Sequence, residues 1–339
     1  MEIFFHHSYN LDVLNLMNLT IDERLQNCYP QEYLEFSQAL SQESRSALQE
    51  IAQALGNTSI SPLVAFVISV IPQFEKTALQ DLLLDEEGFL AAIETHEPRL
   101  MTQKELLLLL FKMLVPVVQE IEMLGFREYW VSELLPELDE RIDQMETALA
   151  RSGFEQQVTT LLEADHLPEE IHVYFCALNG GNGIRLTRQS TMVDVSFSDL
   201  HVINFILSDL LKKAISKQTL QTVNKLLSTD AFILTEFEKS KPVVQIDDIW
   251  AFLKDNLSEG LRVFLIYRAG FITDLSEIIQ SFIKAGYVFS IILLDFLLKE
   301  EQSRKPINEI LDRWMNQAAQ FPLRAAYDEA LQHFEKSGR

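Results

Sequence analysis

Apolar residues recur every three to four positions along almost the whole chain, which is the spacing of amphipathic helices. The clear interruption lies at residues 171–196, where short runs of β-branched and aromatic residues surround the glycine-rich tract 179–183. Three of the eleven glycines lie in that tract, and we expect it to form a tight hairpin turn. The chain is therefore predicted to be an α+β protein, predominantly α-helical, with one small and mainly antiparallel sheet.

Length and charge indicate two regions. At about 100–200 residues per domain, a chain of 339 residues is long enough for two domains. Residues 1–165 hold 28 acidic and 9 basic side chains, whereas residues 166–339 hold 22 and 19. We therefore predict an acidic helical N-terminal region over 1–165 and a second region over 166–339. In the second region we expect the sheet at about 171–196, one helix over 198–216, another over 246–269, and further C-terminal helices.

Several residues are expected to mark helix ends. A short helix is expected to start after Ser41, and Pro62 suits the first turn of another, where its missing N–H costs nothing. Ser198 or Ser196 is placed to cap the helix that follows the sheet. Thr102 begins a capping-box pattern for the long apolar helix that follows it.

The net charge of −22 limits the classes of partner. A surface this negative repels phosphate backbones and anionic headgroups, so we expect neither nucleic acid nor a membrane as partner. No apolar run reaches the ~20 residues of a membrane span, and the first residues lack the features of a signal peptide. Two cysteines, Cys28 and Cys176, rule out a disulfide scaffold. We expect a bacterial, cytoplasmic protein with both cysteines reduced, whose oligomeric state the sequence does not indicate.

Two strings downstream of the expected sheet carry a pattern related to zinc chemistry. The later one reads SEGLRVFL at 258–265, and the earlier one reads HVINFILSD at 201–209. Strands, a glycine-rich turn and two helices in this order resemble the zincin-like catalytic core of gluzincin-type zinc peptidases. In that family the first helix carries the motif HExxH, whose histidines bind zinc and whose glutamate activates water, and the later helix supplies a glutamate ligand. The resemblance covers about residues 170–270 and implies that Glu259 stands at the position of that ligand.

The earlier string keeps the apolar frame of the family motif but not its reactive residues. In the matching register, Phe205 replaces the first zinc histidine, Ile206 the general-base glutamate and Asp209 the second histidine. In a second register, which begins at His201, Val202 replaces the glutamate and Phe205 the second histidine. Aromatic and aliphatic side chains neither bind a metal nor accept a proton. We therefore expect no catalytic residue, no metal and no other cofactor, and bound zinc would require a different register.

Three polar side chains of the two strings form a candidate residual polar site, namely His201, Asp209 and Glu259. Asp209 and Glu259 are suited to a weak site for a hard cation or to an acid/base pair. The favoured alternative leaves Asp209 solvated, or paired with Lys212 or Lys213. We expect His201 to be a hydrogen-bonded structural residue rather than a ligand.

The other histidines and the cysteines show no metal or nucleophile spacing. His6 and His7 are expected to form an exposed N-terminal pair without a third ligand, and His172 to face the surface of the sheet. Cys176 is expected to be a buried strand residue.

These residues favour a catalytically inactive, metallopeptidase-like protein, a pseudoenzyme, that binds a peptide or protein partner in a residual cleft. One alternative is a divergent metal-dependent hydrolase that uses His201, Asp209 and Glu259 as non-standard ligands. Another is an unrelated helical protein-interaction scaffold, in which the glutamate–glycine string is a coincidence. Enzymatic activity is not expected, because both registers lack the general base.

Overall fold

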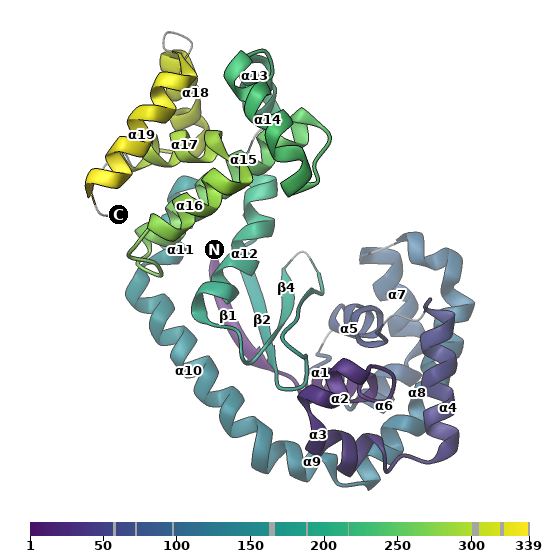
Figure 1. The fold of residues 1–339 in the computed structure, drawn as a ribbon. Coiled ribbons are helices and arrows are strands. Elements are labelled where there is room, and N and C mark those ends of the chain that lie inside the picture. The colour runs from purple at the N-terminus through teal and green to yellow at the C-terminus, as the bar shows by residue number, and fades with distance from the viewer. Residues whose placement is uncertain are drawn as a thin grey trace. The chain divides into compact units, whose positions relative to one another are not determined.

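The computed structural model of this chain describes residues 1–56, 59–71, 73–96, 98–162, 167–187, 189–215, 217–299, 305–318 and 322–337. Contacts between residues divide the chain into two compact units. The sheet unit comprises Ile3–Glu146 and Glu170–Phe197, and the helical unit comprises Met1–Glu2, Thr147–Glu169 and Ser198–Arg339. Figure 1 labels the elements of both units.

The sheet unit combines a small sheet with mostly short helices (Figure 1). The described strands are β1 (Glu2–His7), β2 (Glu170–Cys176), β3 (Gly183–Arg185) and β4 (Ser190–Asp194). The described α-helices are α1 (Tyr9–Asn18), α2 (Glu23–Cys28), α3 (Pro30–Glu32), α4 (Gln42–Ala54), α5 (Ser61–Ser69), α6 (Leu79–Leu84), α7 (Glu86–His96), α8 (Lys104–Met123), α9 (Phe126–Tyr129) and most of α10 (Leu135–Ser152). Two π-helical turns, η1 (Tyr33–Ser37) and η3 (Trp130–Leu134), and the 3-10 helix η2 (Pro98–Gln103) lie among them.

The strands lie in the order β1-β2-β4-β3. β2 and β4 run parallel, with His172 opposite Ser190 and Cys176 opposite Asp194. β3 pairs with β4 in the antiparallel sense, with Ile184 opposite Met192. The expected α+β class with predominant helix is confirmed. The sheet, however, is mixed rather than mainly antiparallel, and β1 is not among the expected strands.

The glycine-rich tract does not form a hairpin between neighbouring strands. It joins β2 to β3, but β4 lies between these two strands in the sheet. The hairpin connects β3 to β4 instead, where the N–H groups of Leu186 and Thr187 donate to the Ser190 carbonyl. Consecutive strands need not be neighbours in a sheet, so a local turn signal cannot decide the strand order.

The contact units do not divide at the predicted boundary between residues 165 and 166. Strands β2, β3 and β4 follow that boundary in the sequence, yet they group with the N-terminal helices. The long-range hydrogen bonding of β1 to β2 explains this grouping. Charge balance and local periodicity carry no information about such a pairing.

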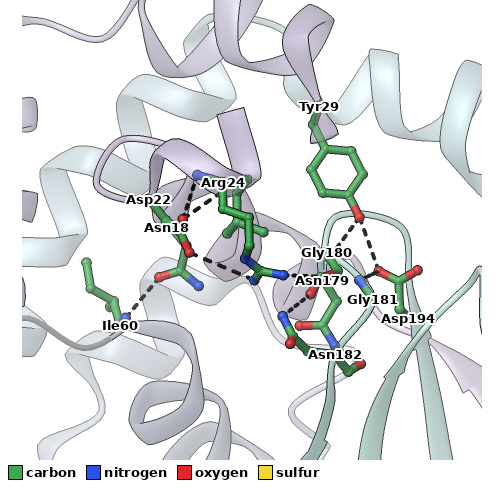
Figure 2. Close-up of polar contacts among 11 residues, drawn as sticks. Asn18, Asp22, Arg24, Tyr29, Ile60, Asn179, Gly180, Gly181, Asn182 and Asp194 are labelled. Carbon is green, nitrogen blue, oxygen red and sulfur yellow. Dashed lines mark hydrogen bonds and ion pairs between the residues drawn. The ribbon is translucent and has the colours of Figure 1, made fainter. Parts of the chain in front are cut away.

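Helix α1 is buried on every side within the sheet unit, from Asn10 to Asn18. Its polar side chains bond to the backbone of surrounding segments. Nδ2 of Asn10 donates to the carbonyls of Phe74 and Thr77 at 2.7 and 2.9 Å. Oδ1 of Asn18 accepts the Ile60 N–H at 2.9 Å (Figure 2). Buried polar groups are tolerated when they are hydrogen-bonded, so α1 positions these segments as well as supplying apolar core.

The helical unit consists of helices over its described residues (Figure 1). After the end of α10 these are α11 (Phe154–Leu161), α12 (Asp199–Ala214), α13 (Lys217–Leu227), α14 (Ala231–Val244), α15 (Ile249–Arg268), α16 (Ser276–Ala285), α17 (Val288–Lys299), α18 (Ile307–Ala318) and α19 (Leu323–Ser337). Within the described ranges, no helix combines the length and the apolar character needed to cross a membrane.

Helix α17 forms the buried centre of the helical unit and packs against α15 and α19. Its buried carboxylate, Asp295, contacts one histidine and one lysine side chain. Oδ1 lies 2.5 Å from Nδ1 of His333, and Oδ2 lies 2.8 Å from Nζ of Lys299. Helix α15 packs against α12 on another side, so it connects the two helices of the zinc-peptidase resemblance to this core.

Most of the expected helix ends are observed. Ser41 and Ser198 cap α4 and α12, because each hydroxyl oxygen accepts a backbone N–H from the first turn. Pro62 lies in the first turn of α5. The capping box at Thr102 is not formed. Helix α8 begins at Lys104, directly after the 3-10 helix η2, and the Thr102 hydroxyl donates back to the Arg99 carbonyl.

Candidate functional site

The string at 201–209, which we compared with the zinc motif, lies on α12 of the helical unit. The helix begins after Ser198, whose Oγ accepts the His201 N–H at 3.3 Å and lies 3.0 Å from His201 Nδ1. The His201 side chain is exposed in this first turn. Its ring therefore makes a local bond at the start of the helix.

The middle of α12 is apolar at the positions that the expected resemblance aligns with the reactive residues of the peptidase family. Ile206, at the general-base position, is only 3% exposed, and Phe205 is half-buried. Asp209 lies on the same helix, but its side chain, like those of Lys212 and Lys213, falls outside the described part of the chain. Ile206 is thus a core side chain of the helical unit.

Glu259, the residue at the third-ligand position, is held by an ion pair. Arg262 lies nearly one turn further along α15, and its Nε donates to Glu259 Oε1 at 3.1 Å. A second guanidinium nitrogen contacts the other carboxylate oxygen, and the third bonds to Oδ1 of Asn204 on α12. Arg262 therefore links α12 to α15 and occupies both oxygens of the half-buried Glu259 carboxylate.

Gly260, which completes the glutamate–glycine string, has a role in helix packing. A Cβ at this position would lie 3.2 Å from the Ser290 carbonyl oxygen and from Leu293 Cδ2, both on α17. Next to this contact the Ser290 hydroxyl donates to the Asn256 carbonyl at 2.8 Å. Glycine allows the backbones of α15 and α17 to approach. The string can therefore be explained without a metal.

The structure packs α12 against α15 but joins them through an arginine and an asparagine. Among the described residues, no three His, Cys, Asp or Glu side chains are arranged to hold a metal ion. The His201, Asp209 and Glu259 set is not assembled by any described contact, since the Asp209 side chain lies outside the described residues.

A second polar cluster lies in the sheet unit, where the parallel strands β2 and β4 end. Asp12 of α1 is completely buried. Its Oδ2 accepts the indole N–H of Trp130 at 2.9 Å, and its Oδ1 accepts the N–H groups of Ala177 and Leu178 at 2.9 and 3.3 Å. Burial raises the pKa of Asp12 to about 7, against the opposing effect of these three donors. Open α/β sheets bind ligands at the carboxyl ends of parallel strands, which makes this edge a geometric candidate.

Asp194, the last residue of β4, anchors the glycine-rich tract from this edge (Figure 2). Its Oδ2 accepts the Tyr29 hydroxyl at 3.1 Å and the Gly181 N–H at 2.9 Å. The Tyr29 oxygen in turn accepts the Gly180 N–H at 2.8 Å, and Arg24 donates to the Gly180 carbonyl at 3.0 Å. The amides of both glycines are thus bonded within the chain, so they do not form an open cradle for a phosphate.

Cys176 ends β2 beside the same carboxylates and is completely buried, as expected. Burial raises the pKa of its thiol well above the usual value, and Asp12 and Asp194 raise it further. A thiol is nucleophilic as the thiolate, so Cys176 is not activated for catalysis. The contacts at this edge indicate a structural role rather than a catalytic one.

The N-terminal histidines belong to β1 and are half-buried, which corrects the expectation of an exposed pair. Nε2 of His6 lies 3.0 Å from Nδ1 of His172 on β2, and Nε2 of His7 lies 3.4 Å from an Asp139 oxygen. Burial lowers the pKa of His6, as do His172 and His7, while Glu75 acts in the opposite direction. These contacts connect β1 to β2 and to α10.

Sequence reasoning missed Asp12 and Asp194. Each stands inside an apolar run, between Leu11 and Val13 or between Val193 and Val195. An isolated carboxylate in such a run signals a buried polar group that needs partners. The partners of Asp12, however, are an indole and two amides far along the chain.

The comparisons with known proteins give no relative from which a role could be transferred. No protein-family model, curated protein or solved structure matches this chain. Functional inference therefore rests on the residues and contacts described above.

Proposed function

We propose that this chain is a catalytically inactive, metallopeptidase-like protein that binds a peptide or protein partner. The observation that carries the proposal is the state of Glu259, whose two oxygens are both engaged by Arg262 while Arg262 is also bonded to Asn204. A carboxylate in this position is a structural element of the helix pair α12–α15. It is not poised to coordinate a metal.

The side chain at the general-base position supports the same conclusion. A zinc hydrolase needs an acid–base group beside the metal-bound water. Ile206 cannot take a proton, and its burial shows that α12 uses this position for packing. Replacing a ligand set by apolar residues stabilises a fold that has lost the metal, because unpaired polar groups are costly to bury.

Binding without catalysis would use the part of α12 that remains accessible. Phe205 is half-buried, and His201 and Ser208 are exposed on the same helix. An aromatic side chain flanked by hydrogen-bonding groups suits recognition of an extended peptide. The proposed surface therefore includes Phe205, and its ligand is a peptide segment.

Measurements of metal content and of peptidase activity test whether the protein lacks metal-dependent catalysis. Untagged protein, purified without chelator or added metal, is analysed by elemental mass spectrometry and then assayed with a mixture of peptides. We expect less than about a tenth of an equivalent of zinc, because neither proposed register of the motif keeps both histidine ligands. One equivalent of zinc, with cleavage that is lost in Glu259→Gln but not in the exposed control Glu277→Gln, would establish the divergent hydrolase instead.

Selection of peptides from a library tests the proposed binding site at Phe205. Peptides selected from a displayed random library should bind the wild-type protein and lose about tenfold or more in affinity for Phe205→Asp. The matched control is Leu234→Asp on α14, which also places a charge at a partly exposed apolar site of the helical unit. Equal loss in both variants would refute a peptide site at Phe205.

A further inference from the structure

Two π-helical turns that are distant in the sequence lie together in the sheet unit. They are η1 (Tyr33–Ser37) and η3 (Trp130–Leu134). The Tyr129 hydroxyl, directly before η3, donates to Glu32, directly before η1, at 2.7 Å. The Phe36 ring lies 5.1 Å from the Tyr129 ring and 5.1 Å from the Phe126 ring. In Figure 1 the neighbouring helices α3 and α9 are correspondingly drawn side by side.

Each turn presents an apolar side chain to solvent. Leu34 is 60% exposed and Val131 is 53% exposed, whereas Phe36 and Trp130 from the same turns are buried. The extra residue of a π turn shifts the following side chains around the helix axis, and such turns occur frequently at functional sites. Both turns therefore carry an exposed aliphatic residue, and the half-buried Tyr129 contacts Glu32 and Phe36 between them.

Carboxylates predominate around these turns, and the nearby Arg127 is paired with Glu122. Residues 29–40 and 128–140 hold seven acidic and no basic side chains. Glu35, Glu128 and Glu133 are exposed among them. The electric field of nearby carboxylates acts on the Tyr129 hydroxyl. Burial raises the pKa of Tyr129 most, the hydrogen bond to Glu32 adds to this, and Glu35 and Glu133 raise it further.

We propose that this two-turn surface, formed by Leu34, Glu35, Tyr129, Val131 and Glu133, docks a basic amphipathic segment of a partner protein. Leu34 and Val131 supply the apolar contact, and the carboxylates select lysine and arginine around it, since complementary charge sets specificity and association rate. A second copy of this chain is disfavoured as occupant, because the same carboxylates would face one another across a symmetric interface.

The proposal goes beyond the function proposed above and does not depend on it. Every residue of the two-turn surface belongs to the sheet unit, whereas α12 and α15 belong to the helical unit. Loss of peptide binding at Phe205 and loss of binding at Leu34 are therefore separate outcomes in separate variants.

Calorimetry with a synthetic probe tests the surface. The probe is a helical peptide of about five turns with lysines on one face and leucines on the other, titrated at physiological salt. We expect Leu34→Ser/Val131→Ser and Glu35→Gln/Glu133→Gln each to weaken its binding about tenfold. The matched controls are Leu84→Ser/Leu109→Ser and Glu43→Gln/Glu50→Gln, all at exposed positions of the same unit. They should change affinity by less than about twofold.

Three outcomes would overturn the proposal. Equal weakening by the control pairs would mean that the peptide is attracted by overall charge alone. No weakening by either surface pair would place the peptide elsewhere. A wild-type dimer in sedimentation that Leu34→Ser/Val131→Ser converts to monomer would identify a second copy of the chain as the occupant. Circular dichroism of each variant establishes that the substituted proteins remain folded.

Discussion

At the residue scale, single polar side chains hold the sheet unit together over long sequence distances. Asp12 bonds both to Trp130 in η3 and to the amides of Ala177 and Leu178 that follow β2. A carboxylate without counter-charge in the interior is expensive, yet these donors would be equally expensive to leave unpaired. The protonation state of Asp12 therefore couples stability to pH.

Asp12→Asn tests this coupling, because it removes the titrating group while nearly keeping its shape. The pKa of Asp12 is raised from 3.8 to about 7, so the folded chain holds a proton between these values that the unfolded chain has released. This contribution to the free energy of unfolding is complete below about pH 4 and is lost as the pH rises through 7. At about 1.4 kcal/mol per pKa unit, wild type should lose on the order of 4 kcal/mol relative to the variant across that range.

Urea denaturation of both proteins at steps from pH 4 to pH 8 measures the difference. Asp81→Asn, at an exposed position on α6, is the matched control and should give a nearly constant difference from wild type. A constant offset for Asp12→Asn as well would show that Asp12 does not titrate in this interval.

Alanine substitutions at two adjacent glycines distinguish the cost of backbone strain from the cost of a steric clash. Gly180 and Gly181 have φ of +63° and +70°, which an alanine adopts at a cost of roughly 1–2 kcal/mol. A Cβ on Gly180 would also lie 2.2 Å from Leu25 Cδ2, whereas one on Gly181 meets nothing within 4 Å. In urea denaturation, Gly180→Ala should therefore destabilise the protein by about 1–3 kcal/mol more than Gly181→Ala. Equal effects would mean that Leu25 moves aside freely.

At the element scale, the residues of α12 and α15 that we compared with a zinc-peptidase motif have structural roles. Ile206 is a core side chain, and both oxygens of Glu259 are bonded to Arg262. Gly260 fits the crossing with α17. Because these side chains take part in packing or pairing, introducing a residue of the zinc motif there should disturb the helix pair.

The substitution Ile206→Glu tests whether a motif residue disturbs the helix pair. Ile206 is 3% exposed, so the new carboxylate would be buried without a designed partner and should cost about 3 kcal/mol or more in the free energy of unfolding. Ser208→Glu places the same side chain at an exposed position of α12 and should change stability by less than about 0.5 kcal/mol. Thermal and urea unfolding compare the two variants. An Ile206→Glu protein as stable as wild type would show that position 206 is accessible to water.

The sequence predicts helices and strands better than it predicts which segments they contact, and the reason is physical. Ser198 caps its helix through a bond three residues away, and such local chemistry is readable from the string itself. The capping box at Thr102 fails because the preceding turn winds as a 3-10 helix. The order β1-β2-β4-β3 and the bonds of Asp12 depend on segments brought together only by folding. Candidate residues on α12 and α15 could therefore be named from the sequence, whereas the bond from Arg262 to Asn204 and the contacts between the two π-helical turns could not.

At the scale of the whole molecule, the two units differ in charge. Of the 50 acidic and 28 basic residues, 26 and 10 lie in the sheet unit, and the remaining 24 and 18 lie in the helical unit. The acidic character expected for residues 1–165 thus remains with the unit that contains most of them. Like charges on a compact unit repel one another and lower its stability, and added salt screens this repulsion.

Salt should therefore stabilise the sheet unit more than the helical unit. Raising the ionic strength from about 0.01 M to about 1 M shortens the screening length from about 30 Å to about 3 Å. Hydrogen exchange followed by mass spectrometry resolves peptides from each unit, and we expect amides of α1, β2 and β4 to slow more than those of α15 and α17. An unstructured reference peptide corrects for the effect of salt on intrinsic exchange, and sorbitol at equal osmolality controls for solvent exclusion. Equal slowing in both units would contradict the argument, because a general salting effect on apolar burial acts on both cores, whereas relief of self-repulsion must follow the excess of carboxylates.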